Sequence, residues 1–301
     1  MLSRQEIQAI DGLAILLIVI YHVLTTYNDF VPLIDAHWAN LGWMGLGIFT
    51  FISGYKLMIN HGSELSDKRF LKGYAAKRFV RIAKPYFVYA FLMMLIRNQS
   101  INELEIWSIL RGVPLSAPHL WYLYVLMIIT VGVLAILYFS QEKIVFVLLP
   151  ILILIYFTMR PSSLVGLGAV FIAGLAWSRW DPSYWNPLKL SPRLVLYLIS
   201  AVFFIFFILA IQKYQAIAIG LTFPAVAVLI APYLMGFGYL GKYAFAIYLL
   251  HLPIIEPNVT FDLMSYSQDL WIIVPAVILT ILISIGLYEL LRITKLNKLF
   301  E

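Results

Sequence analysis

The sequence predicts an all-α integral membrane protein with about ten transmembrane helices, forming a single domain over residues 1–301. Of its residues, 62% are hydrophobic and only 12% are charged, whereas soluble domains carry about 25% charged residues. Apolar stretches recur along the whole chain, and many reach the roughly 17–25 residues that a helix needs to cross the hydrocarbon core. The stretches do not alternate with a period of two, so they predict helices and not barrel strands.

Ten spans result when the long apolar runs are divided at turn residues. Helix is the expected conformation in each, because backbone amides in lipid must be paired within the segment. The predicted spans are 8–27, 41–60, 82–97, 119–139, 143–159, 162–180, 194–212, 216–235, 238–256 and 270–292. No cleavable signal peptide is expected, because the first span lacks a small-residue cleavage site and a second span follows at once.

The cations predict that both termini are cytoplasmic. Ten spans with an inside N-terminus place sixteen of the 21 lysines and arginines on the cytoplasmic side and four on the outer side, with Lys56 inside a span. This asymmetry follows the positive-inside rule. The net charge of +6 therefore reflects topology and does not indicate a nucleic-acid partner. The absence of cysteine excludes disulfides and thiolate chemistry.

The most polar part of the chain, HGSELSDKRFLKGYAAKRFVRIAKPY, lies between the second and third predicted spans. Phe70, Tyr74 and Phe79 fall at roughly helical spacing among its cations, which predicts an interfacial amphipathic helix. Pro85 is expected to open the third span, where a missing N–H costs least. The longer outer segments, RNQSINELEIWSILRGVPLSAPH and EPNVTFDLMSYSQD, are places where a substrate could be received.

Two histidines are embedded in apolar stretches. His22 in GLAILLIVIYHVL lies about 18 Å beyond Ile10 at the rise of a helix, and His251 in GKYAFAIYLLHLPII lies about 13 Å beyond Lys242. Ionisable residues at such depth usually face the protein interior and mark a site, so the two rings could share one cavity. The alternatives are a neutral core imidazole bonded to a carbonyl for His22, and a ring bonded to water or a loop near the outer interface for His251.

Cations and glycines suggest how a cytoplasmic ligand could bind. Arg78, Arg81 and Lys84 are three residues apart and share a helical face, an arrangement that suits phosphate, although the positive-inside rule also enriches this loop in cations. The glycine-rich stretch GWMGLGIFTFISGYKLM, which contains Ser53, allows close helix approach or local unwinding. Lys56 at its inner end is expected to snorkel.

Aromatic residues open the fourth predicted span. In PHLWYLYVLMII, His119, Trp121 and Tyr122 are typical of an aromatic belt at the outer membrane interface. No metal site is expected, because the five histidines are scattered and no carboxylate accompanies them at ligand spacing.

Six stretches together resemble the acyltransferase-3 family of bacterial integral-membrane O-acyltransferases: IDGLAILLIVIYH, WMGLGIFTFISGYKLM, KRFVRIAKPYFVYAF, HLWYLYVLMI, GAVFIAGLAW and LGKYAFAIYLLHLPI. The resemblance implies an acyltransferase of the bacterial cytoplasmic membrane that transfers groups other than aminoacyl groups. Cytoplasmic acyl-CoA, with acetyl-CoA expected, would be the donor substrate and no cofactor would be bound. The acceptor would be a hydroxyl of a carbohydrate or other cell-envelope molecule.

The resemblance also implies roles for individual residues. It implies family positions at His22, Arg81, Ser53, Trp121, Tyr248 and His251. Together with the residue pattern, we expect His22 as general base with His251 and Tyr248 as catalytic partners. We expect acyl-CoA contacts at Arg78, Arg81, Lys84 and Ser53, and an acceptor side at Trp121 and His119. A neutral imidazole suits base catalysis because its usual pKa is near 6.5. Two positions depart from the family pattern: Asp11 stands where many members have arginine, and Ala244 stands where they have serine.

Two other functions remain open from the sequence. A transporter or flippase for a lipid-linked sugar or small solute would use His22 as a proton relay. The chain shows no visible inverted repeat and few carboxylates in its spans, which favours the acyltransferase. A scaffold that has lost catalysis is the third interpretation, suggested by Asp11 and Ala244.

Overall fold

The computed structural model describes residues 2–28, 39–98, 103–139, 163–178, 226–227, 230–255 and 270–296. These residues form α-helices and short 3-10 helices. The elements are α1 (Arg4–Asn28), α2 (Ala39–His61), α3 (Lys68–Asn98), α4 (Glu103–Leu110), η2 (Pro118–Leu120), α5 (Trp121–Phe139), α7 (Ser163–Ser178), η3 (Ala231–Phe237), α11 (Gly238–Lys242), α12 (Ala244–Ile255), η4 (Leu270–Ile272) and α14 (Ile273–Ile293).

The helices confirm the all-α membrane fold. Four of them, α1, α3, α5 with η2, and α14, are long and apolar enough to cross a membrane, and the bent pair η3/α11 and α12 makes a fifth. Two further predicted spans lie on α2 and on the shorter apolar helix α7. The predicted spans 143–159 and 194–212, and most of 216–235, lie outside the described residues.

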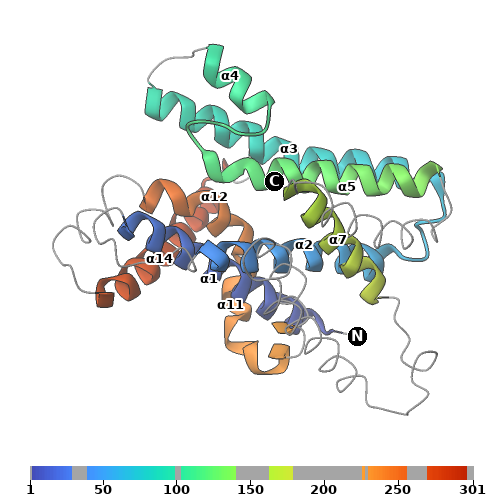
Figure 1. The fold of residues 1–301 in the computed structure, drawn as a ribbon, viewed down its shortest axis with the longest axis horizontal. Helices are drawn as coiled ribbons and strands as arrows, with labels where there is room; N and C mark the ends of the chain where they lie inside the picture. Colours follow the sequence, from blue (N-terminus) through green and yellow to red (C-terminus); the bar gives the residue numbers. More distant parts are fainter. Residues whose placement is uncertain are drawn as a thin grey trace.

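Helix α1 is the centre of the bundle. It packs against α2, α11, η3, α12 and α14, while α3 pairs with α5, and α7 contacts both α2 and α5. Figure 1 shows α3 and α5 side by side along one edge, with α1 and α2 below them and α12 and α14 at one end. The start of α5 therefore comes close to α1, α2 and α12, which is where the cavity described below lies.

The prediction of a separate interfacial helix before the third span is wrong. Helix α3 runs without a break from Lys68 to Asn98 and contains Pro85 in its interior. Its 31 residues rise about 46 Å, more than the roughly 30 Å of the hydrocarbon core. The cationic turns are thus an extension of the span. Pro85 is tolerated because buried Ile82, Tyr86 and Tyr89 on both sides anchor the helix in the core.

The predicted span 238–256 is bent. Helices η3/α11 and α12 meet at 65° beside Tyr243. Two glycines let α11 pack directly against α1. A Cβ at Gly241 would overlap the carbonyl oxygen of Gln8, and a Cβ at Gly12 would overlap that of Phe237. Glycine allows α1 and this segment to approach backbone to backbone.

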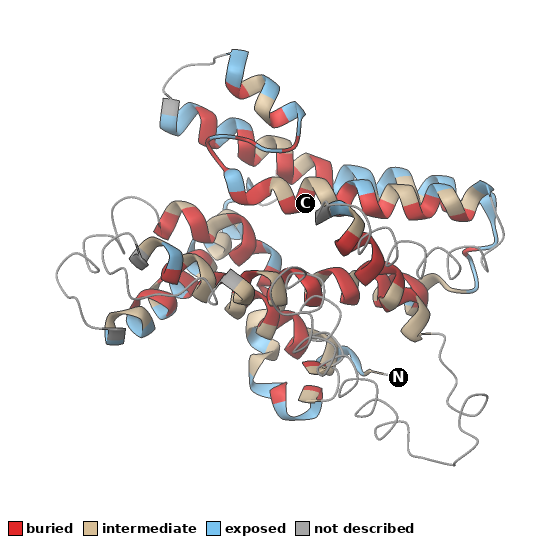
Figure 2. Cartoon of the chain, in the orientation of Figure 1, coloured by how far each residue is buried: buried red, intermediate tan, exposed pale blue. Residues whose placement is uncertain are grey.

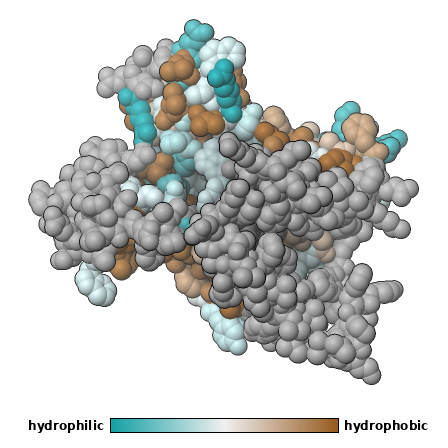
Figure 3. Space-filling view, in the orientation of Figure 1, coloured by the Kyte–Doolittle hydropathy of each residue, from teal (hydrophilic) through white to brown (hydrophobic). Residues whose placement is uncertain are grey.

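Buried residues gather on the facing sides of the helices. Figure 2 shows buried positions on α3 and α5 turned toward each other and toward the bundle, with exposed positions along the outer edge of the pair. In Figure 3, hydrophilic side chains stand out around α4 and at the far end of the α3–α5 pair, with hydrophobic ones between them. This order matches a helix pair that crosses an apolar layer and leaves it at both ends.

Candidate active site

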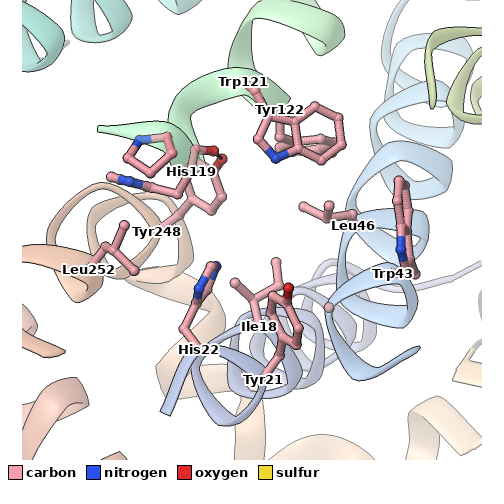
Figure 4. A pocket seen from close by; sticks show the side chains of 12 residues that line it. Ile18, Tyr21, His22, Trp43, Leu46, His119, Trp121, Tyr122, Tyr248 and Leu252 are labelled. Carbon is pink, nitrogen blue, oxygen red and sulfur yellow. Dashed lines mark hydrogen bonds between the residues drawn. The ribbon is translucent and has the colours of Figure 1, made fainter. Parts of the chain in front are cut away.

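A cavity of about 340 Å³ opens where four helical elements meet. Figure 4 shows side chains from α1, α2, the η2–α5 junction and α12 pointing toward one another around it. The lining residues are Ile18, Tyr21, His22, Gly42, Trp43, Leu46, Pro118, His119, Trp121, Tyr122, Tyr248 and Leu252. The cavity therefore combines imidazole, phenol and indole groups with an aliphatic floor.

Three imidazoles lie in contact at one side of the cavity. The ring centroids of His22 and His251 are 5.0 Å apart, and those of His251 and His119 are 5.3 Å apart. The predicted adjacency of His22 and His251 is thereby confirmed. His251 lies behind the cavity lining and is fully buried, whereas His22 is half-buried and faces the open space.

Hydrogen bonds fix the tautomer of His251. Its Nδ1 lies 3.0 Å from the carbonyl oxygen of Ile247 and 2.8 Å from that of Tyr248. Carbonyl oxygens only accept, so Nδ1 carries the proton in a neutral ring and Nε2 is left with a lone pair. That Nε2 has no hydrogen-bonding partner among the described residues. The interpretation of His251 as a ring bonded to water or a loop is therefore wrong, and its imidazole offers an acceptor beside His22.

Two tyrosines tie the cavity walls together. The hydroxyl of Tyr248 on α12 donates to the backbone carbonyl of His119, which joins α12 to η2. Thr50 donates its single hydroxyl proton to the carbonyl of Leu46 at 2.7 Å, so the Tyr122 hydroxyl, 3.0 Å from Thr50 Oγ1, is the donor of that pair. This second bond joins α5 to α2. Both hydroxyls thus hold helices in place around the open volume.

The interpretation of residues 119–122 as an aromatic belt is wrong for two of its three members. His119 is only 5% exposed and Tyr122 only 3%. Both line the cavity because η2 turns the chain inward just before α5 begins. Trp121 is half-buried and also lines the cavity, with its ring centroid 5.9 Å from that of Trp43 on α2.

Trp43 is a lining residue that the sequence analysis did not single out. It shares a face of α2 with Leu46 and Thr50, three and seven residues further on, and that face borders the cavity. The spacing was visible in the sequence. The glycines around Trp43, however, favoured the interpretation of this stretch as a helix-packing surface.

The predicted acyl-CoA residues do not line the cavity. Arg78 and Lys84 are half-buried and Arg81 is exposed on α3, and Ser53 is half-buried on α2. Arg78 is the less exposed of the two arginines and precedes Arg81 by about one turn of α3.

Lys56 does not simply snorkel. Its Nζ lies 2.5 Å from the Asp11 carboxylate, so the two charges form an ion pair between α1 and α2. Asp11 is eleven residues before His22, which puts the two side chains on nearly the same face of α1 about 17 Å apart. The acidic residue that departs from the family pattern is thus neutralised by a lysine from the neighbouring span.

These elements define an α-helical membrane protein whose bundle encloses a cavity with an accessible imidazole on its wall. A sequence model of the acyltransferase-3 family, described as an acyltransferase domain, matches residues 4–289. The match covers nearly the whole chain, so the protein belongs to this family and is a membrane protein of the acyltransferase class. No curated protein and no solved structure matches the chain.

Proposed function

We propose that the protein is a membrane O-acyltransferase that moves an acyl group, expected to be acetyl, from cytoplasmic acyl-CoA to a hydroxyl of a carbohydrate or other cell-envelope acceptor. The observation that carries the proposal is the half-buried ring of His22, which faces the cavity in a chain of the acyltransferase-3 family. A general base must come within hydrogen-bond distance of the proton that it removes.

The proposal places the protein in the bacterial cytoplasmic membrane with ten spans and both termini inside. The cationic start of α3 then faces the cytoplasm, while α4 and η2 lie toward the outer side. The donor would enter from the inner end, with Arg78, Arg81 and Lys84 near its phosphates and Ser53 along the path of its pantetheine arm. The acceptor would arrive from the outer end beside His119 and Trp121.

In the reaction, neutral His22 removes the proton from the acceptor hydroxyl while that oxygen attacks the thioester carbonyl carbon. The carbon–sulfur bond of the tetrahedral intermediate then breaks. His22 returns the proton to the departing CoA sulfur, which leaves an ester and a free thiol. A single imidazole can serve both steps because the nitrogen that accepts the proton from the acceptor can donate it again to the leaving sulfur.

His251 and Tyr248 would support His22 from the second layer. The bonds from His251 Nδ1 to its own helix hold the ring against His22 with Nε2 unprotonated. Tyr248 fixes the carbonyl of His119 and so holds the outer wall of the cavity. Trp43 and Trp121 provide flat apolar faces, against which the C–H groups of a sugar ring can pack.

Labelled acetyl-CoA tests the proposal. The purified protein would be incubated with acetyl-CoA labelled in the acetyl group and with a glycan and lipid extract of bacterial envelopes. We expect label in an acceptor together with an equal amount of free CoA. A flippase would move its solute without consuming acetyl-CoA, so unchanged acetyl-CoA and unlabelled acceptors would contradict the proposal.

A further inference from the structure

An aromatic cluster lies outside the cavity, at the junction of α2 and α3. It consists of His61, the last residue of α2, and Phe70 and Tyr74 on the first turns of α3. The ring centroid of His61 is 5.2 Å from that of Phe70 and 4.8 Å from that of Tyr74. Phe70 and Tyr74 are stacked, with centroids 5.5 Å apart and an angle of 23° between the rings. All three residues are half-buried, so part of each ring is accessible.

The cluster continues into a cationic strip along α3. Phe70, Tyr74 and Arg78 follow one another at intervals of four residues and Arg81 comes three later, so the four side chains share one face of the helix. Arg78 is half-buried and lies one turn beyond Tyr74, so the cationic part of the strip begins where the aromatic cluster ends.

We infer that the aromatic cluster binds the adenine ring of the acyl donor, next to the phosphates that the proposed function places at Arg78 and Arg81. The inference rests on the proposed function, which makes acyl-CoA the donor. A purine has a flat π face that stacks on aromatic side chains. Guanidinium groups donate paired hydrogen bonds to phosphate oxygens.

A carboxylate completes the chemistry that adenine requires. Glu64 Oε2 lies 2.8 Å from His61 Nδ1, and half of the Glu64 side chain is exposed. Its carboxylate only accepts hydrogen bonds. The exocyclic amine of adenine is a donor and fits beside it, whereas the carbonyl oxygen of guanine at the same position would be repelled.

Truncated donors separate the nucleotide contact from the chemistry. Steady-state rates would be measured with acetyl-CoA and with acetyl-pantetheine, which lacks the nucleotide. For Tyr74→Leu and Phe70→Leu we expect the KM for acetyl-CoA to rise about tenfold, equivalent to about 1.4 kcal/mol, with kcat unchanged. The kinetics with acetyl-pantetheine should match those of the wild type.

Phe79→Leu is the matched control. Phe79 is an exposed aromatic residue of the same helix outside the cluster, and its variant should behave as wild type with both donors. If Tyr74→Leu and Phe70→Leu slow acetyl-pantetheine as much as acetyl-CoA, the cluster only packs α2 against α3 and the inference is overturned. Unchanged kinetics with both donors would overturn it as well.

Direct binding keeps the test independent of turnover. Adenosine 3′,5′-bisphosphate would be titrated into the purified full-length protein, and we expect about tenfold weaker binding for Tyr74→Leu than for Phe79→Leu. Equal binding by the two variants would refute the nucleotide site. Should the wild type acylate nothing with either donor, the proposed function would fail, while binding of the bisphosphate that depends on Tyr74 would still support the site.

Discussion

His22 differs from the other two imidazoles of the cavity in its accessibility. His119 and His251 are 5% and 0% exposed, whereas His22 is half-buried and lines the open volume. Only an accessible ring can reach the hydroxyl of an acceptor. The other two are therefore suited to hold His22 in position, and His22 is the residue on which the proposed chemistry depends.

Substitution of His22 should therefore greatly slow turnover and spare the fold. We expect His22→Gln to lower kcat by about 10²–10⁴-fold, the usual contribution of a general base, as measured by transfer of labelled acetyl groups. The thermal unfolding midpoint in detergent should stay close to that of wild type, because no side-chain hydrogen bond of His22 to the described residues is lost. Thr25→Ala, one turn further along α1 and exposed, is the control. A His22→Gln rate within a few-fold of wild type would remove His22 from the mechanism.

Sequence reasoning reached His22 and His251 but misplaced their neighbours. Counting helical rise from Ile10 and from Lys242 put both rings at similar depth, and the structure brings their centroids to 5.0 Å. The same depth argument assigned His119 and Tyr122 to the interface, because depth does not tell which side of a helix faces inward. The inward turn at η2 decides this, and it depends on the bond from Tyr248 to His119, 129 residues away in the sequence.

Among the helix contacts, the crossing of α2 and α7 depends on two glycines. A Cβ at Gly54 would overlap the carbonyl oxygen of Phe171, and a Cβ at Gly174 would overlap that of Phe51. The two backbones therefore touch directly. Because Thr50 on α2 also accepts the hydrogen bond of Tyr122, this crossing helps to position the cavity wall.

We expect Gly54→Ala and Gly174→Ala each to destabilise the protein by about 1–3 kcal/mol, the usual cost of overpacking. Gly132→Ala on α5 is the control, because a Cβ there meets no atom within 4 Å and alanine is the better helix former. Unfolding in detergent titrated with SDS would give the free energies. Wild-type stability for both Gly54→Ala and Gly174→Ala would contradict the backbone contact.

The ion pair between α1 and α2 predicts that substituting Lys56 destabilises the protein more than substituting Asp11. The Lys56 side chain is 40% exposed and the Asp11 side chain only 12%. Lys56→Met leaves the buried Asp11 carboxylate without its partner. The free energy of unfolding should then fall by an amount approaching the roughly 3–5 kcal/mol that removal of one partner of a buried pair costs. Asp11→Asn leaves a lysine that can extend toward water, so it should cost clearly less.

The double variant Asp11→Asn/Lys56→Met tests the same pair by a mutant cycle. Replacement of both charges removes the stranded group, so its stability should recover most of the loss seen in Lys56→Met. Additive losses, or equal losses in the two single variants, would show that the pair does not act as the geometry indicates.

Helix existence could be predicted from the sequence more securely than helix shape. Apolar run length located α1, α2, α5 and α14, because the membrane fixes how many residues a span needs. The continuity of α3 through Pro85 and the bend beside Tyr243 could not be predicted in this way. Both depend on packing partners distant in the sequence, and local propensity does not contain that information.

At the scale of the whole molecule, the proposed reaction requires two separate entrances to one cavity. The cationic turns of α3 lie at one end of the α3–α5 pair, and α4 with η2 lies at the other. A thioester made in the cytoplasm and an acceptor on the outer side can then meet near His22. This geometry holds only if the start of α3 and the end of α14 face the cytoplasm and η2 faces outward.

Single cysteines test this topology without background, because the chain contains no cysteine. Ser63, Leu115 and Lys295 are exposed positions after α2, before η2 and after α14. In intact bacterial cells, a membrane-impermeant maleimide should label Leu115→Cys at once and should label Ser63→Cys and Lys295→Cys only after permeabilisation.

Eight predicted spans separate Ser63 from Lys295, an even number that returns the chain to the same side. Labelling of Ser63→Cys and Lys295→Cys from opposite sides would mean an odd number, and ten spans would be wrong. Labelling of both in intact cells would reverse the orientation and place the cationic strip away from cytoplasmic acyl-CoA.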